Sequence, residues 1–234
     1  MTMTSAPKPM TLVSPDVLAR WEAEYERGMD KRFPSLELVR LERWYFEGRP
    51  GRALEYGFGT GVNLLYLLER GYQVEGVDAC RGALRMAEQK LAQRPELRSR
   101  VTLTQIAPNA VTLPFADASL DYVVCLSVLS LLGSRERAAW LVSELHRVMK
   151  PGAKLLIDIN SAESDFAKRG TPLGEDIYEY RGGRDDQPIH CYCPSSGEAL
   201  RTLLAAFTVD DVGYAAYRYL GRDSYEPIAC ARKP

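Results

Sequence analysis

Short apolar segments alternate with amphipathic ones along this 234-residue chain, and that alternation constrains its fold more than any other feature. Strands that alternate with helices form parallel sheets covered by helices on both faces. The sequence therefore predicts an α/β fold with a doubly wound, parallel sheet. The expected strands are 52–56, 73–78, 101–106, 120–126 and 153–159, with further strands at 208–214 and 225–232. The expected helices between them are 62–70, 82–93, 134–149 and 197–206.

Two segments flank or interrupt this alternation. Residues 13–50 contain two expected helices, which begin after Ser14 and Ser35, and they form an N-terminal helical cap. Residues 160–196 are polar and form an insertion after the fifth strand, which we expect to be a lid over the site; Gly182-Gly183 is its expected hairpin turn. Residues 1–12 read as a loose tail. A chain of this length predicts one domain over residues 1–234.

Charge and composition exclude several partners. Lys and Arg number 30 against 31 Asp and Glu, so the net charge is −1, which argues against broad binding to nucleic acid. The most apolar stretch, 123–132, is too short to cross a bilayer, which needs about 20 helical residues. The N-terminus lacks an apolar signal segment, so we expect a cytoplasmic protein with free thiols on its five cysteines. The oligomeric state stays open.

The chemistry is concentrated at a glycine-rich turn, residues 57–61, which leaves the first strand and enters a helix. Glycines let the backbone turn sharply and let a ligand approach helix N–H groups. Asp78 ends the next strand, where a carboxylate can accept both hydroxyls of a ribose. The pattern predicts a nucleoside at the carboxyl edge of the sheet.

Two details of the turn decide between nucleosides. Val62 stands where a dinucleotide fingerprint has its last glycine, so the match to NAD is imperfect. Glu55 would place a negative charge near a pyrophosphate, whereas it would attract the ammonium group of S-adenosylmethionine (SAM).

Segment 54–61 resembles motif I of the class I SAM-dependent methyltransferases, and three more segments resemble that family in order. Residues 77–79 look like its ribose-binding strand end, 113–124 look like the LPFxDxSFD block of the ubiquinone-biosynthesis type, and 144–153 are similar to the helix and turn before the fifth strand. The resemblance implies a Rossmann-like, mostly parallel seven-stranded sheet with an antiparallel last strand. It also implies transfer of a methyl group from SAM to a small molecule, with S-adenosylhomocysteine as the second product.

The family's cofactor-binding residues carry over position by position. Gly57, Gly59 and Gly61 would hold the methionine half together with Phe58, Glu55 would face its ammonium, and Asp78 would hold the ribose. Adenine would meet Ala79, the backbone N–H of Ala110 and Asn109, which stands where the family usually has an Asp. The backbone carbonyl of Cys125 would lie beside the methionyl group.

The methyl acceptor is less constrained by the sequence. His190, in the insertion, is the candidate general base by elimination, because the chain has only two histidines; a solvated hairpin histidine is the alternative. Candidate acceptor-binding residues are Trp21, Tyr25, Tyr178, Arg184 and Tyr192. Residues 190–193 lack the second Cys or His cluster that a tetrahedral zinc site needs, so no metal is expected. Methylation at O, N or C is not distinguished.

Three alternatives stay open. The glycine turn could serve packing alone. A SAM-binding protein without catalysis, acting as a regulator or partner subunit, has the same motifs. An NAD-dependent oxidoreductase or epimerase shares the glycine turn, but it usually needs a Tyr four residues before a Lys, and no Lys of this chain has one.

Overall fold

The protein is represented by a computed structural model, which describes residues 13–182, 186–220 and 222–234. The expected tail, residues 1–12, lies outside the described residues. So do Gly183 of the expected hairpin turn and the candidate acceptor-binding residue Arg184.

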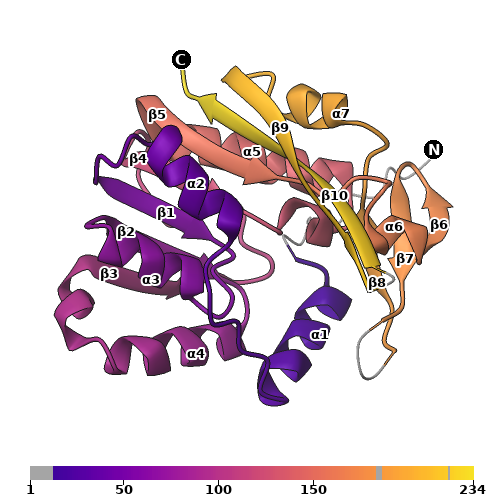
Figure 1. Ribbon diagram of the computed structural model, residues 1–234, viewed down its shortest axis with the longest axis horizontal. Coiled ribbons are helices and arrows are strands. Elements are labelled where there is room, and N and C mark those ends of the chain that lie inside the picture. The colour runs from indigo at the N-terminus through magenta and orange to yellow at the C-terminus, as the bar shows by residue number, and fades with distance from the viewer. Residues whose placement is uncertain (1–12, 183–185, 221) are drawn as a thin grey trace, which may run out of the picture.

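A seven-stranded sheet forms the centre of the molecule (Figure 1), in the order β3-β2-β1-β4-β5-β10-β9. Strands β1 to β5 run parallel, and β10 runs antiparallel to both of its neighbours. This confirms the predicted fold, including the antiparallel last strand. The strands are β1 (Arg52–Tyr56), β2 (Gln73–Asp78), β3 (Val101–Gln105), β4 (Leu120–Cys125), β5 (Met149–Asp158), β9 (Thr208–Tyr219) and β10 (Arg222–Arg232).

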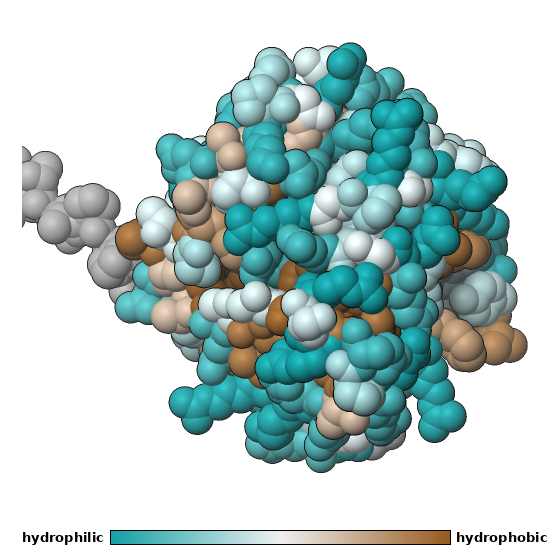
Figure 2. Space-filling view, turned by 90° about the vertical axis from the view of Figure 1, so that its left-hand side faces the viewer, coloured by the Kyte–Doolittle hydropathy of each residue, from teal (hydrophilic) through white to brown (hydrophobic). Residues whose placement is uncertain are grey.

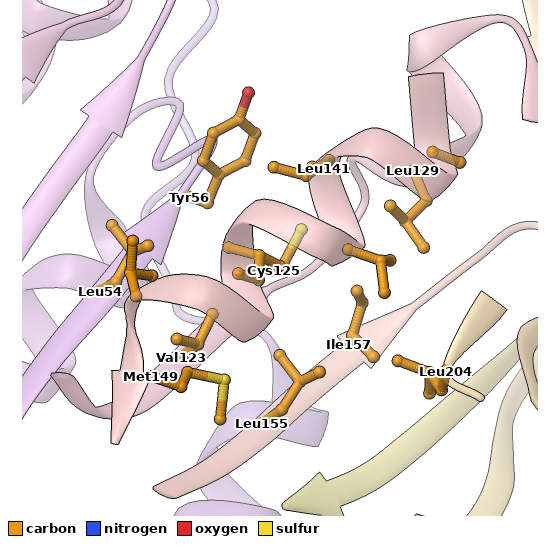
Figure 3. Close-up of a cluster of buried hydrophobic side chains, with 14 of the residues drawn as sticks. Leu54, Tyr56, Val123, Cys125, Leu129, Leu141, Met149, Leu155, Ile157 and Leu204 are labelled. Carbon is orange, nitrogen blue, oxygen red and sulfur yellow. The ribbon is translucent and has the colours of Figure 1, made fainter. Parts of the chain in front are cut away.

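Helices cover both faces of this sheet, as a doubly wound fold requires. One face packs against α2 (Leu36–Trp44), α3 (Val62–Glu69) and α4 (Arg81–Ala92), with Leu38, Leu64 and Leu91 fully buried. The other packs against α5 (Arg135–Val148) and α7 (Gly197–Leu203). Figure 3 shows the second core, in which Leu141 of α5 and Leu204 lie close to side chains of β1, β4 and β5. Two 3-10 helices, η1 (Pro95–Arg100) and η2 (Leu129–Leu132), complete the connections.

Three strands are longer than the sequence predicts. β5 begins at Met149, because Met149 already pairs with Leu120 of β4 before an irregularity in the register. β9 and β10 extend each other as a long antiparallel ribbon, in which Tyr214 stacks on Tyr225 with ring centroids 4.8 Å apart. Strand length here depends on pairing between distant segments rather than on local propensity.

The insertion forms a short helix and a separate three-stranded antiparallel sheet. These are α6 (Asp165–Lys168), β6 (Thr171–Gly174), β7 (Ile177–Tyr180) and β8 (Ile189–Tyr192). The buried face of the small sheet includes Tyr180, Ile189 and Cys191, and it packs on Val17 of α1 (Pro15–Glu26). The first helix and the insertion therefore support each other, although they are far apart in the sequence.

On the side seen in Figure 2, most side chains are hydrophilic, and apolar ones gather in a hollow near the centre and at parts of the edge. All five cysteines are buried and unpaired. Among the helices that the structure describes, none is long and apolar enough to cross a membrane.

Candidate functional site

The glycine-rich turn follows β1 and has the left-handed backbone that its composition predicts. Gly57, Gly59 and Gly61 have φ angles of 74°, 55° and 78°. At Gly57 the requirement is also steric, because a Cβ there would lie 2.5 Å from Cγ2 of Val128. The turn therefore passes directly against the segment that follows β4.

Asp78, at the end of β2, fixes this turn. Its Oδ2 accepts a hydrogen bond of 2.9 Å from the Gly59 N–H, and its Oδ1 accepts one of 2.9 Å from the Cys80 N–H. Burial raises the pKa of Asp78, and these backbone N–H groups oppose the rise. Each carboxylate oxygen can accept more than one hydrogen bond, so Asp78 retains capacity for ligand hydroxyls.

Glu55 lies beneath the turn and is 3% exposed. Its Oε2 is buried without a hydrogen-bond partner among the described residues. Burial raises the pKa of Glu55 to about 8, while a hydrogen bond with the Asn63 side chain opposes the shift. A buried carboxyl oxygen without a partner is costly, and a ligand ammonium group would relieve that cost.

This raised pKa predicts a pH-dependent stability for the unliganded protein. The folded state keeps Glu55 protonated up to about pH 8, whereas the carboxyl in the unfolded chain ionises near pH 4.5. Its contribution to stability is therefore present below pH 4.5 and is lost as the pH rises to about 8. Glu55→Gln cannot ionise, so the variant should gain stability over the unaltered protein across that window. Urea unfolding of both proteins from pH 4 to 9 measures the gain; a difference that does not change with pH would contradict the prediction.

A cavity of about 480 Å³ opens above the turn, at the carboxyl ends of the strands. Seven of the predicted site residues line it: Trp21, Tyr25, Gly57, Phe58, Gly59, Asp78 and Ala79. Gly61 lies behind the turn, where a Cβ would be 3.1 Å from Cβ of Ala87 on α4. Cys125 is fully buried in the core, and the residues that follow it, Leu126, Ser127 and Val128, line the cavity.

Helix α1 covers one side of the cavity and contributes a contact that the sequence did not predict. Glu22 accepts hydrogen bonds from the N–H groups of Arg81 and Gly82, the latter at 2.9 Å, at the start of α4. The N-cap residue of α4, Cys80, provides no side-chain cap, so Glu22 supplies the missing acceptor. Gly82 also has to be a glycine, because a Cβ there would lie 2.5 Å from Cβ of Tyr25.

The adenine-binding segment differs from the expectation. Asn109 is exposed, and neither Asn109 nor Ala110 lines the cavity. The Ala110 N–H, which the resemblance assigns to adenine, donates instead to the carbonyl of Ala107 at 2.9 Å. The Ala110 N–H is therefore used within a tight turn, and the structure does not support its assignment to adenine.

The insertion also contributes different residues from those predicted. Ile189 and Cys191 point into the small core, so the alternation of a strand turns His190 the other way. Its side chain is 46% exposed, and Nδ1 lies 3.5 Å from Oδ2 of Asp16. His190 does not line the cavity, which corrects its assignment as the base.

The two predicted tyrosines of the insertion also lie elsewhere. Tyr192 lines a separate hollow with Arg135 and Glu136, and Tyr178 does not line the main cavity. From the helix and small sheet of the insertion, the residues that line the main cavity are Asp165, Phe166 and Tyr180.

Asp158, at the end of β5, is a further buried acid, which contacts the cavity wall without lining the cavity itself. It is 4% exposed, and its Oδ1 accepts a hydrogen bond of 2.6 Å from the N–H of Ser127, which has a positive φ of 60°. Burial raises the pKa of Asp158 to about 8. An acid within the apolar strand 153–159 is the sequence signal that could have identified it.

This strand order, with a glycine turn after β1 and an acid after β2, defines a Rossmann-like nucleoside-binding domain. Residues 54–157 match the family model described as a methyltransferase domain. This segment is therefore a methyltransferase domain, and its fold is that of the SAM-dependent methyltransferases, whose cofactor is S-adenosylmethionine.

Individual relatives agree with this assignment. The phosphatidylethanolamine N-methyltransferase of Cereibacter sphaeroides is 33% identical over 129 residues, which are 55% of this chain and 58% of that protein. The chain spans less than two thirds of the length of the curated relatives that it matches.

Solved structures share the fold. A SAM-dependent methyltransferase from Methanosarcina mazei has a TM-score of 0.64 at 24% identity, over 78% of this chain and 92% of that one. The 1,6-didemethyltoxoflavin-N1-methyltransferase of Burkholderia thailandensis, solved with bound 1,6-didemethyltoxoflavin and S-adenosylhomocysteine, has a TM-score of 0.67 at 18% identity, over 99% of this chain and 94% of that one.

Proposed function

We propose that this protein transfers a methyl group from SAM to a small-molecule acceptor. The observation that carries the proposal is the buried Glu55, whose Oε2 has no partner among the described residues, beneath the glycine turn fixed by Asp78. These residues fit the cofactor: Glu55 would bind its ammonium, Asp78 its ribose hydroxyls, and Phe58 and Ala79 would provide an apolar wall. When bound, SAM supplies a methyl group on a positively charged sulfur.

The chain's own contribution is to hold the acceptor in line with that methyl group and to exclude water. Trp21, Phe166 and Tyr180 line the cavity from α1 and the insertion, so both segments can shield the reacting groups. A cavity of about 480 Å³ has the size of a small-molecule site. The near-neutral net charge gives no general attraction for nucleic acid.

Calorimetric titration with SAM, S-adenosylhomocysteine and NAD, each alone, tests the proposal. We expect micromolar binding of the first two and none of NAD. Binding of NAD alone, or of none of the three, would overturn the assignment. Incubation with methyl-labelled SAM and a panel of small metabolites then distinguishes an enzyme from a protein that only binds SAM, because only an enzyme labels an acceptor.

A further inference from the structure

The cavity continues past the cofactor-binding residues to the β9–β10 ribbon. Tyr217 of β9, and Ser224 and Glu226 of β10, line it together with the glycine turn. In the sheet, β4 and β5 separate β10 from β1, so these side chains reach the cavity from a different part of the sheet than β1, whose Glu55 is not among the lining residues. None of the residues proposed to bind the cofactor lies on β9 or β10, so this part of the cavity is left for the acceptor.

Glu226 lines this part of the cavity, and a second acid, Asp158, lies behind its wall. Asp158 ends β5 and pairs with Ile228 of β10, two residues after Glu226. The Ser224 hydroxyl donates a hydrogen bond of 2.9 Å to Oε1 of Glu226 and so orients that carboxyl. Burial, and after it the charge of Glu226, raises the pKa of Asp158.

Acidic side chains outnumber basic ones around this end of the cavity. Burial raises the pKa of Glu226, Glu37 of α2 raises it further, and the Ser224 hydrogen bond and Lys31 oppose the rise. Lys31, between α1 and α2, is an exposed cation that also lines the cavity, and its charge lowers the pKa of Glu55 and of Asp158 as well. A cationic ligand would balance this end better than a neutral or anionic one.

Apolar and aromatic side chains lie beside the two acids. Trp21, Phe166 and Tyr217 line the same cavity. Aromatic faces attract cations and also bury apolar surface, so the walls suit a molecule with a positive group and an apolar body.

We propose that the methyl acceptor is a small amine with an apolar body, and that Glu226, oriented by Ser224 and backed by Asp158, receives its nitrogen. This inference rests on the proposed function. The Glu226 carboxylate first takes one proton from the ammonium group and leaves a neutral amine. The nitrogen lone pair then forms the bond to the methyl carbon as the carbon–sulfur bond breaks, its electron pair stays on sulfur, and the product carries the positive charge as a methylated ammonium.

Glu226 is suited to this proton transfer. A general base works best when its pKa is near the operating pH, and the burial of Glu226 moves its pKa upward in that direction. Because Glu226 also lines the cavity, the same carboxyl can bind the ammonium and then deprotonate it.

A pair of probes of similar shape tests the inference: phenethylammonium and 2-phenylethanol, titrated calorimetrically into the protein saturated with S-adenosylhomocysteine. The expected result is a preference of about tenfold for the ammonium, since a charge-assisted hydrogen bond is stronger than a neutral one. Glu226→Gln should remove that preference without changing the affinity for S-adenosylhomocysteine. Glu198→Gln is the matched control, because the Glu198 side chain is 80% exposed on α7, and it should keep the preference.

Asp158→Asn is a second variant for the case that Glu226→Gln does not fold. Its amide oxygen can still accept the Ser127 N–H, so it removes the ionisable carboxyl and keeps the contact. It should reduce the preference for phenethylammonium. Equal binding of both probes to the unaltered protein, or an unchanged preference in the variant that folds, overturns the inference.

The two proposals fail in different ways. Failure of SAM and S-adenosylhomocysteine to bind overturns the proposed function. Binding of S-adenosylhomocysteine without any preference for the ammonium overturns only the identity of the acceptor.

Discussion

Gly57→Ala should destabilise the protein by on the order of 3 kcal/mol and weaken cofactor binding by more than about tenfold. Two costs add. An alanine at φ 74° is strained, and its Cβ would lie 2.5 Å from Cγ2 of Val128, so the turn or the segment after β4 has to move. Either movement displaces atoms that line the cavity. Urea unfolding measures the first effect, and calorimetry with S-adenosylhomocysteine measures the second.

Gly152→Ala separates the two costs. Gly152 has a similar φ of 78°, but a Cβ there would have nothing within 4 Å, so only the backbone strain applies. We expect a loss of about 1 kcal/mol and no change in cofactor affinity. If both variants lose the same stability, steric contact with Val128 does not add to the cost of Gly57→Ala.

Asp78→Ala should weaken binding of S-adenosylhomocysteine by about 10- to 100-fold, the effect of losing a charge-assisted contact of roughly 1.5 to 3 kcal/mol. The variant also leaves the N–H groups of Gly59 and Cys80 without their acceptor, so the turn loses its link to β2. Calorimetry gives the affinity, and urea unfolding shows how much of the loss reflects a disturbed fold.

Asp117→Ala is the control for that variant. Its side chain is 78% exposed and pairs with Arg147, away from the cavity. Its affinity for S-adenosylhomocysteine should equal that of the unaltered protein. An unchanged affinity in Asp78→Ala as well would contradict the ribose-binding role.

The cofactor half of the site could be predicted because its determinants are local. The glycine turn follows its strand directly, and Asp78 ends the neighbouring strand, so strand order alone brings them together. The parallel sheet was predictable for the same reason, since each strand and helix has its own pattern and its own glycine or proline boundary.

The rest of the site depends on contacts between distant segments. Glu22 reaches α4 only after α1 has packed on it, 59 residues away along the chain. The orientation of His190 depends on which face of β8 meets α1, and periodicity over a four-residue strand does not reveal that. Glu226 reaches the cavity because β10 is inserted beside β5, and nothing near it in the sequence resembles a site motif.

The position of β10 between β5 and β9 also has a consequence for biosynthesis. Residues 52–80, which make the glycine turn and its link to Asp78, leave the ribosome long before β10. Among the described residues, β9 pairs in the sheet only with β10, so neither β9 nor the outer edge of β5 has its partner until β10 has been made. A nascent chain therefore contains every residue of the glycine turn well before it can complete the part of the cavity that contains Glu226, and domains generally fold as units.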